Sequence, residues 1–468
     1  MNFRSGIVKH YHESVYANLT EAALYTRCRL FPSFAAVRPE APVTHYDSVI
    51  VGAGPAGLAA ASRLAHRGLR VLLLDQGHAI DRRDRHAEAE LTQGHGGAGL
   101  YSDGKFSFYP SATELWRLPY RAPLRQAYAW TRELLAAHGM TTPPFPDRAD
   151  VYTPCHNAWS LKHYPSYYLP LEQREAMIAN LVDSLDVEIV SDTQVISQRY
   201  DEGEARHHLQ LRAADGTSSA LTATTLVWAA GRFGPLALGE GIRTRFRRLE
   251  VGFRIEQPSE HAFFQDFADL DPKLTLHAAD KTTEWRTFCA CRHGRTVLTQ
   301  TQGLWTVSGH SDGPPTARSN VGFNTRILDE SLARETIAAL TRTLGRADTH
   351  FDLPLSAWLA DDHDATAAME RVYGAPLAQA MQRGLRQLVD NFPLLEAEST
   401  RLIGPTLEGV GWYPEVDESL RLGDRPTWVV GDACGLFRGI VAAFVSGHYA
   451  ASAVAEALTQ PARLQERA

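Results

Sequence analysis

Cysteine is scarce in this sequence, with 5 among 468 residues scattered along the chain. An odd and scattered set is not the paired framework of a small secreted domain, so we expect free thiols in a reducing compartment. Cys289 and Cys291 form a Cys-x-Cys pair. A zinc site needs about four clustered ligands, however, and no second cluster accompanies the pair. We therefore predict no metal site.

Long hydrophobic runs are also missing. The most apolar stretches, Val49 to Ala61 and Ile440 to Val445, fall short of the ~18 to 20 residues that a membrane-spanning helix needs. The first residues also lack the run of about 7 to 15 apolar residues of a secretory signal. We therefore expect a cytoplasmic protein that does not span a membrane.

An excess of positive charge is absent as well, because 47 Lys and Arg stand against 54 Asp and Glu, for a net charge of −7. Proteins that bind nucleic acid show a basic domain or stripe, so neither nucleic acid nor a membrane surface is an expected partner. With 44% apolar and 22% charged residues, the composition is that of a globular protein of two or three domains. The expected partner is a small-molecule substrate, and the oligomeric state is left open.

A glycine-rich turn joins a predicted strand at 47–51 to a predicted helix at 55–67. Its glycines, Gly52, Gly54 and Gly57, have the spacing G-x-G-x-x-G. In this context the first allows a tight turn, the second lets the backbone approach a pyrophosphate, and the third lets helix and strand pack closely. The amino end of the helix would attract the phosphates. We predict a dinucleotide site here.

Three further segments bear on which dinucleotide binds. Asp75 ends the next predicted strand, at 70–75, where a carboxylate can bind ribose hydroxyls. A strand at 225–230 runs directly into Gly231, and a strand at 426–432 ends at Asp432 before a long helix. Asp432 can accept a hydrogen bond from a ribityl hydroxyl, and the helix can direct its positive end at a flavin. The last two segments, TLVWAAGRFG and VVGDACG, resemble the strand-then-Ala-Gly segment and the distal Gly-Asp motif of two-dinucleotide-binding flavoproteins, and this resemblance favours FAD over NAD.

The residues expected to bind FAD lie mostly in these turns and strand ends. They are Gly52, Gly54, Pro55, Ala56, Gly57, Asp75, Gln76, Gly97, Ser102, Asp103, Gly104, Val195, Ala230, Gly231, Gly431, Asp432, Gly439 and Ile440.

Several segments together resemble an FAD-dependent dehydrogenase family of the glutathione-reductase-like (two-dinucleotide-binding) flavoprotein class, a largely uncharacterised group of oxidoreductases. The matching segments are VIVGAGPAGLAAASRLA, GGAGLYSDGKFSF, LKHYPSYY, VGFRIEQP, RTFCAC, VSGHSDGPPTARSNVGF and GDACGLFRGIVAAFVSGHYAA. They span Val49 to about Ala451. The chain departs from that family after Cys291, where the usual Pro-Gly-Gly turn is missing.

The glycine-rich loop at 94–108 is expected beside the isoalloxazine ring, because glycines admit a flat ring and Lys105 could stabilise reduced flavin or bind an acidic substrate. A solvated loop lysine is the alternative. A dehydrogenase also needs a base, and histidine is the natural proton acceptor near neutral pH. The catalytic candidates are Lys105, His163, Tyr164, Arg286 and His310, with His95 and Lys162 considered beside them.

The predicted fold is α/β: a doubly wound, Rossmann-like FAD-binding domain with an inserted α+β substrate domain that contains an antiparallel sheet. The predicted divisions are an N-terminal extension at 1–45, a discontinuous FAD-binding domain at 46–110, 181–234 and 400–457, and a substrate domain at 111–180 and 235–399.

The predicted function is an FAD-dependent oxidoreductase, a dehydrogenase or oxidase that transfers hydride between a small organic substrate and flavin N5. One alternative is an NAD(P)H-dependent flavin monooxygenase or reductase of the same fold, with NAD(P)H as reductant. Another is a non-catalytic flavin-binding electron carrier, against which the polar loop at 102–105 weighs. No second G-x-G-x-x-G follows a strand and no Cys-x4-Cys pair is present, so thiol–disulfide chemistry is disfavoured.

Overall fold

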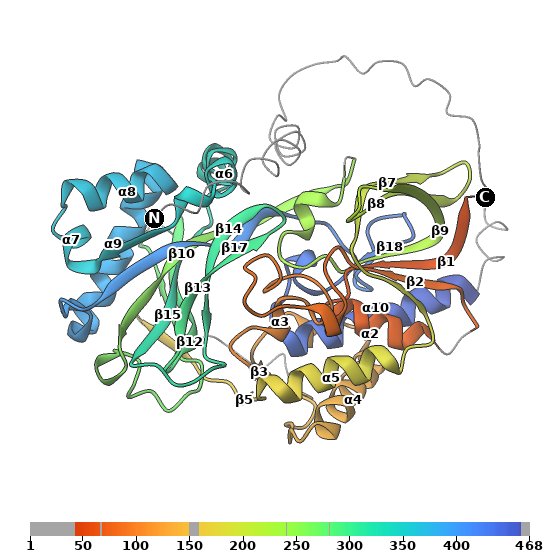
Figure 1. Ribbon diagram of the computed structural model, residues 1–468, viewed down its shortest axis with the longest axis horizontal. Helices are drawn as coiled ribbons and strands as arrows, with labels where there is room; N and C mark the ends of the chain where they lie inside the picture. Colours follow the sequence, from red (N-terminus) through yellow and green to blue (C-terminus); the bar gives the residue numbers. More distant parts are fainter. Residues whose placement is uncertain (1–42, 66–67, 149–158, 240, 280, 460–468) are drawn as a thin grey trace, which may run out of the picture.

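The computed structural model describes residues 43–65, 68–148, 159–239, 241–279 and 281–459. Residues 1–42 of the predicted extension lie outside these ranges, as do Cys28 and Cys155. The described chain forms two sheet-based units that lie side by side (Figure 1).

The first unit is built on a seven-stranded sheet of order β6-β2-β1-β9-β8-β7, with β18 also paired to β9. The strands β6, β2, β1, β9 and β18 are parallel, as the predicted Rossmann-like domain requires. The strands are β1 (Thr44–Val51), β2 (Val71–Leu74), β6 (Glu188–Val190), β7 (Thr193–Asp201), β8 (Arg206–Ala213), β9 (Ser218–Trp228) and β18 (Thr427–Val429). The strand β2 and the carboxyl ends of β1 and β9 are buried apolar runs because both faces of this part of the sheet are covered.

Two helices from opposite ends of the chain cover one face of this sheet. They are α2 (Pro55–Leu64) and α10 (Ile440–Thr459), and α4 (Arg121–Ala137) packs against α10 in turn (Figure 1). The helices α2 and α10 approach closely, since a Cβ on Gly447 would lie 1.9 Å from the carbonyl oxygen of Ala56. A fourth helix, α5 (Leu171–Asp183), contributes Met177, Ile178 and Leu181 to the same core.

Among the described residues, α10 is long and apolar enough by length and composition to cross a membrane. The sequence predicted no such run. In the structure 72% of the apolar window of α10 is buried within the protein, where it packs against α2 and α4. Its apolar character therefore has an explanation in core packing.

The strands β7 and β8 form an antiparallel hairpin that the sequence did not predict. The sequence around His207 and His208 is polar and predicts no strand, whereas these residues lie within β8. Their pattern is that of a half-exposed strand, with His207, Leu209 and Leu211 buried and the residues between them more exposed.

The second unit is built on another seven-stranded sheet, of order β16-β17-β10-β15-β12-β11-β4, all of it antiparallel. Its strands are β4 (Ser160–Lys162), β10 (Thr244–Pro258), β11 (Lys273–His277), β12 (Thr283–Cys291), β15 (Arg318–Ile327), β16 (Phe351–Pro354) and β17 (Arg401–Pro414). One face is covered by helices, namely α6 (Glu330–Leu344), α7 (Leu355–Leu359), α8 (His363–Tyr373) and α9 (Ala375–Asn391). The sequence also predicts helices at 331–344 and 377–388, which correspond to α6 and α9.

Alternation along β10 separates the two faces of the second sheet. Leu249, Val251 and Phe253 enter the core beneath the helices, whereas the charged Glu250 between the first two lies on the other face. Small pieces complete the fold: α3 (Gly97–Leu100), the pair β3 (Lys105–Ser107) and β5 (Ser166–Tyr168), and the pair β13 (Arg295–Thr301) and β14 (Leu304–His310).

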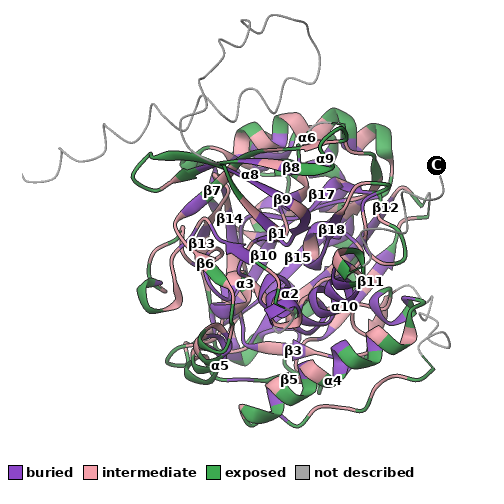
Figure 2. Cartoon of the chain, turned by 90° about the vertical axis from the view of Figure 1, so that its right-hand side faces the viewer, coloured by how far each residue is buried: buried purple, intermediate pink, exposed green. Residues whose placement is uncertain are grey.

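The division between the units differs from the predicted one in two places. The strand β17, predicted with the FAD-binding domain, pairs with β10 and β16 in the second sheet. The helices α4 and α5, predicted mostly with the substrate domain, pack in the core of the first unit. Figure 2 shows the buried residues gathered along both sheets and along α10.

Candidate functional site

A cavity of about 2660 Å³ is lined by residues of both units. Small-molecule sites are typically about 300 to 1,000 Å³, so this cavity has room for a ligand of dinucleotide size together with a second molecule. Its lining includes the carboxyl ends of β1, β2 and β9 in the first sheet, the residues that follow β18, and the charged face of the second sheet. Parallel α/β sheets bind ligands at this edge.

The glycine turn at one end of the cavity has the geometry predicted from its spacing. Gly52 has φ of +106°, and a Cβ there would lie 2.5 Å from the carbonyl oxygen of Ala229. Gly54 precedes the first turn of α2, and both Gly54 and Pro55 line the cavity. A Cβ on Gly57 would lie 1.8 Å from the carbonyl oxygen of Gly52, so this glycine allows helix and turn to touch. The amino end of α2 therefore opens into the cavity.

Asp75 follows β2 and is held by backbone amides. Its carboxylate accepts hydrogen bonds from the N–H groups of Ala53 (2.7 Å), Gly77 (2.8 Å) and Gly94 (3.0 Å). Asp75 thus fastens the glycine turn to the loop that follows β2, in addition to lining the cavity beside Gln76. A carboxylate has about four acceptor positions, so one is left for a ligand hydroxyl.

The far part of the cavity is formed by the end of β18 and the start of α10. Gly431, Asp432, Gly439 and Ile440 all line it. One oxygen of Asp432, Oδ2, accepts a hydrogen bond from Nε of Arg438 at 3.0 Å. The other, Oδ1, is buried without a hydrogen-bond partner among the described residues. Buried polar atoms are almost always satisfied, so Oδ1 has an acceptor position to offer a ligand donor in the cavity.

Arg174 holds the glycine-rich loop over the glycine turn. This buried arginine donates to the carbonyl oxygens of Leu100 (2.9 Å) and Leu169 (2.6 Å) and forms a buried ion pair with Asp312. A Cβ on Gly104 would lie 2.3 Å from Nη1 of Arg174, so Gly104 serves this packing. The loop also brings Gly97 against Gly54, where a Cβ on Gly97 would meet Gly54 Cα at 3.1 Å.

Lys105 and Asp103 bring a buried ion pair from this loop to the cavity. Nζ of Lys105 lies 3.0 Å from Oδ2 of Asp103 and also donates to the carbonyl oxygen of Ala290 on β12. Burial alone would lower the pKa of Lys105, but the charges of Asp103 and Asp271 raise it by more than burial lowers it. The pKa of Lys105 therefore lies above the ordinary value. Lys105 is therefore a fixed positive charge rather than a base.

An ion-pair network covers the charged face of the second sheet. At its centre is the fully buried Glu250, whose carboxylate accepts from Arg326 (2.6 Å), Arg286 (2.8 Å), Arg248 (2.9 Å) and Arg438 (3.3 Å). The members of this network are Glu250, Glu284, Glu408, Asp432, Arg232, Arg248, Arg286, Arg326 and Arg438. Five arginines thus face four carboxylates, which leaves excess positive charge beside the cavity.

Two lysines face each other across neighbouring strands of the cavity wall. Lys273 on β11 is the register partner of Lys162 on β4, and both line the cavity. Burial lowers the pKa of Lys273 to about 8, against the opposing effect of Asp271. Burial and the charge of Lys273 likewise lower the pKa of Lys162 to about 8. Amines with such pKa values can accept protons near neutral pH.

We expect Lys273 to be half-deprotonated near pH 8 instead of near its ordinary 10.5. The test is competitive acylation with an amine-reactive anhydride from pH 6 to 11, with the modified lysines quantified by mass spectrometry. The midpoint of labelling at Lys273 should fall near pH 8, with the exposed Lys281 as reference. A midpoint that coincides with that of free lysine would contradict the prediction.

The five catalytic candidates have different positions in the structure. Tyr164 lines the cavity and donates to Oδ2 of Asp271 at 2.7 Å, and burial with this contact raises its pKa well above the ordinary value. His310 also lines the cavity, and burial lowers its pKa to about 4, so its imidazole is neutral at pH 7. Lys105 and Arg286 line the cavity within ion pairs. The side chain of His163, by contrast, is 72% exposed, bonds to Asp269 and does not line the cavity.

Most residues predicted to bind FAD line the cavity. The exceptions are Gly57 and Gly104, which do not line it and instead allow close packing of the chain. Those on the lining are Gly52, Gly54, Pro55, Ala56, Asp75, Gln76, Gly97, Ser102, Asp103, Val195, Ala230, Gly231, Gly431, Asp432, Gly439 and Ile440.

Other cavity residues were missed by sequence reasoning, notably Lys273, Asp271 and Glu408. A signal for Lys273 exists in the alternation of KLTLH, in which Leu274 and Leu276 are buried and Lys273, Thr275 and His277 line the cavity. This pattern is also that of a strand with one solvated face, so the sequence alone does not show that the face is a cavity wall.

Comparison with known proteins bears on the first unit. Residues 50–83 match the family of NAD(P)-binding Rossmann-like domains. No curated protein matches the chain in sequence. Similar solved structures include a flavoprotein/dehydrogenase from Cytophaga hutchinsonii, with 11% identity, a TM-score of 0.38 and coverage of 88% of this chain and 79% of that chain.

A second is PqsL of P. aeruginosa in complex with 2-aminobenzoylacetate, with 14% identity, a TM-score of 0.37 and coverage of 90% of this chain and 89% of that chain. A third is the anhydrotetracycline hydroxylase OxyS from Streptomyces rimosus, with 14% identity, a TM-score of 0.40 and coverage of 91% of this chain and 66% of that chain. These likenesses are distant. The family match agrees with the geometry of β1, α2 and β2, and the predicted fold class, a Rossmann-like domain joined to an antiparallel second sheet, is confirmed.

Proposed function

We propose that this protein is an FAD-dependent oxidoreductase. The observation that carries the proposal is that one cavity extends from the glycine turn before α2 to the amino end of α10. At the α10 end, Oδ1 of Asp432 has no hydrogen-bond partner among the described residues. A dinucleotide needs a pyrophosphate site and a polar site for each of its halves, and the cavity supplies these residues.

The electrostatics of the second end favour a flavin over a nicotinamide. The amino end of α10 carries the positive end of a helix dipole, and the ion-pair network adds excess positive charge. A flavin gains negative charge at its N1 and C2=O edge on reduction, whereas the oxidised nicotinamide ring is cationic. A site with excess positive charge stabilises the reduced flavin and repels the oxidised nicotinamide ring.

The residues that would hold FAD follow from these positions. The amides at Gly54 and Pro55 to Ala56 would take the pyrophosphate, Asp75 the adenosine ribose, and Asp432 a ribityl hydroxyl. Bound FAD supplies a two-electron acceptor for hydride. The protein's own contribution is to bury the substrate between the sheets and to hold its charge with the arginines of the ion-pair network.

Proton transfer falls to the lysine pair. Lys273 is the better candidate base, because its pKa of about 8 leaves a share of neutral amine at pH 7 to 8. Tyr164 keeps its proton and Lys105 keeps its charge, so both can orient a substrate oxygen without exchanging protons. The substrate is a small organic molecule with a C–H bond that can be oxidised, and the site can accommodate an anionic group on it.

The direct test is the absorption spectrum of the purified protein, followed by acid precipitation and mass analysis of the released cofactor. A flavin spectrum and the mass of FAD in the supernatant are the expected results. Substrates can then be screened by anaerobic bleaching of the flavin band. A colourless protein that takes up no FAD but binds NAD(P)⁺ would overturn the proposal.

Replacing Asp432 by asparagine is expected to weaken FAD binding about 10- to 100-fold, because a hydrogen bond to a charged acceptor contributes about 1.5 to 3 kcal/mol. Fluorescence titration of the FAD-free protein measures the change. The matched control is Asp424→Asn, an exposed residue a few positions before β18. Equal affinity in the Asp432→Asn variant and the control would show that Oδ1 does not bind the cofactor.

A further inference from the structure

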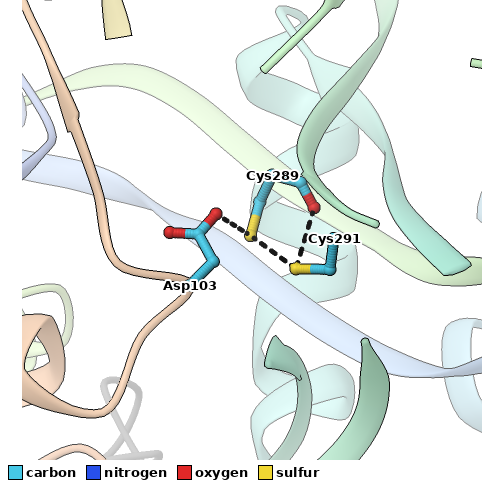
Figure 3. Close-up of side chains that lie close together, drawn as sticks. All are labelled: Asp103, Cys289 and Cys291. Atoms are coloured by element: carbon cyan, nitrogen blue, oxygen red, sulfur yellow. Dashed lines mark hydrogen bonds between the residues drawn. The ribbon is translucent and has the colours of Figure 1, made fainter. Parts of the chain in front are cut away.

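Cys289 and Cys291 lie at the end of β12 with their sulfur atoms 3.9 Å apart (Figure 3). Two residues apart on a regular strand, the side chains are separated by roughly 6.6 Å along the chain. The ladder between β12 and β15 is irregular between Phe288 and Cys291, and Cys289 has φ of +49°. A left-handed conformation is uncommon for a non-glycine residue. This bulge brings the two sulfurs together.

The two thiols differ in their access to the cavity. Cys289 lines it, beside Asp103 and Phe288, whereas Cys291 is fully buried behind and does not line it. A molecule in the cavity therefore reaches the sulfur of Cys289 first.

Contacts around the pair hold Cys289 as the thiol and favour the thiolate of Cys291. The Cys289 thiol donates to Oδ2 of Asp103 at 3.0 Å, which provides a proton acceptor, while its contact with Cys291, its burial and the charge of Asp103 raise its pKa well above the ordinary value. Nη2 of the buried Arg254 lies 3.7 Å from Sγ of Cys291 and donates to the carbonyl oxygen of Cys289 at 2.6 Å. The thiol of Cys289, with Arg254 and Lys105, lowers the pKa of Cys291, which favours its thiolate.

We infer that Cys289 and Cys291 form a redox-active dithiol–disulfide pair that reacts with a low-molecular-weight disulfide in the cavity. The inference goes beyond the proposed flavin chemistry and does not require a bound cofactor. It also revises the expectation, drawn from the missing Cys-x4-Cys motif, that thiol–disulfide chemistry is disfavoured. The Cys-x-Cys spacing alone did not show that the bulge would join the sulfurs.

The reaction proceeds in two exchange steps. Asp103 takes the proton of Cys289, whose sulfur attacks the disulfide R–S–S–R and breaks its S–S bond, so that a mixed disulfide forms and the leaving R–S⁻ takes the proton from Asp103 and departs as R–SH. The Cys291 thiolate then attacks Sγ of Cys289 and expels the second R–S⁻, which is protonated from solvent. The dithiol is oxidised to a disulfide, and R–S–S–R is reduced to two R–SH. Excess thiol drives the same steps in reverse.

A metal site is the competing use of the same atoms. Oxygen of Asp103 and the sulfurs of Cys289 and Cys291 lie within 4.8 Å of one another. Two buried cations stand against it, because Lys105 is paired with Asp103 and Arg254 lies beside Cys291. A divalent cation would be repelled by both, whereas a thiolate is stabilised by them.

The test uses the purified wild-type protein with glutathione disulfide as the probe, followed by alkylation under denaturing conditions and tryptic digestion. Arg286 and Arg292 flank both cysteines, so one peptide, Thr287 to Arg292, reports on the pair. We expect this peptide to lose two hydrogen masses after treatment and to recover two alkylation sites after dithiothreitol. Cys434 is buried and does not line the cavity, so it is the internal control and should remain a free thiol that is fully alkylated after the treatment.

Two variants separate the roles of the thiols. Cys291→Ser should accumulate a glutathione adduct on Cys289, because the second exchange step is lost. Cys289→Ser should form no adduct on Cys291. The inference is overturned if the wild-type peptide keeps two alkylatable thiols under conditions that oxidise the unfolded protein. It is also overturned if the purified protein contains stoichiometric zinc whose removal is needed before the disulfide forms. None of these readouts depends on FAD, so the proposed function can fail while the inference holds.

Discussion

Replacing Glu250 by glutamine is expected to lower the free energy of unfolding by about 3 to 5 kcal/mol, the range found when one partner of a buried ion pair is removed. The carboxylate is fully buried and accepts from four arginines on β10, β12, β15 and the segment before α10. Glutamine keeps the shape but leaves those guanidinium groups without their shared counter-charge. Urea unfolding followed by circular dichroism measures the loss.

The pH dependence of unfolding offers a second readout of Glu250. Burial alone would raise its pKa, but Arg286, Arg326, Arg248 and Arg438 lower it well below the ordinary 4.5. A carboxyl with a lowered folded-state pKa contributes its stability in full above the pKa of the unfolded state and loses it as the pH falls towards the folded value. Stability should therefore fall below about pH 4.5 in the wild type and fall less steeply in the variant.

The control for Glu250→Gln is Glu415→Gln, which removes an exposed ion pair with Arg245. Exposed pairs contribute about 0 to 1 kcal/mol, so this variant should unfold close to the wild type. If the two glutamine variants lose equal stability, the four-arginine arrangement does not stabilise the fold as described.

Gly57→Ala is expected to yield a protein that no longer retains FAD. A Cβ at this position would lie 1.8 Å from the carbonyl oxygen of Gly52, which is backbone and cannot rotate away. The amino end of α2 must then move from the turn, and with it the amides proposed to bind the pyrophosphate. Overpacking of this kind costs about 1 to 3 kcal/mol. The measurement is the ratio of flavin to protein absorbance after purification.

The matched control is Gly313→Ala, because nothing lies within 4 Å of a Cβ at that position. Far-ultraviolet circular dichroism should show that both variants fold. Full FAD content in Gly57→Ala would show that FAD binding does not depend on the close contact of α2 with the turn, and the assignment of the pyrophosphate site to the amides at the amino end of α2 would have to be abandoned.

The sequence predicted the part of the first unit formed by β1, the glycine turn, α2 and β2, because the signals for these elements are local. The turn from Gly52 to Gly57 and the apolar strands around it depend on neighbours a few residues apart. The hairpin of β7 and β8 was missed because polar residues on a half-exposed strand have no strong period. The assignment of β17 to the wrong sheet has a similar cause, since strand partners are chosen across the fold.

The chemistry of the second sheet was harder to predict because it depends on strand register. Lys273 and Lys162 are far apart in sequence, and only the pairing of β11 with β4 brings them together. Glu250 gathers arginines from four segments in the same way. His163 lies next to two cavity residues, Lys162 and Tyr164, yet alternation along the chain turns it to the surface.

The packing of α10 on α2 has a consequence for how the protein is made. The first strand, the glycine turn and α2 leave the ribosome early, but the helix that covers them begins only at Ile440. At about 5 to 20 residues per second, the wait lasts on the order of 20 to 75 s. During that time the side of α2 that packs on α10 is uncovered, and Ala56 lacks its contact with Gly447. The surface of α2 that packs on α10 is therefore completed only when α10 has been synthesised.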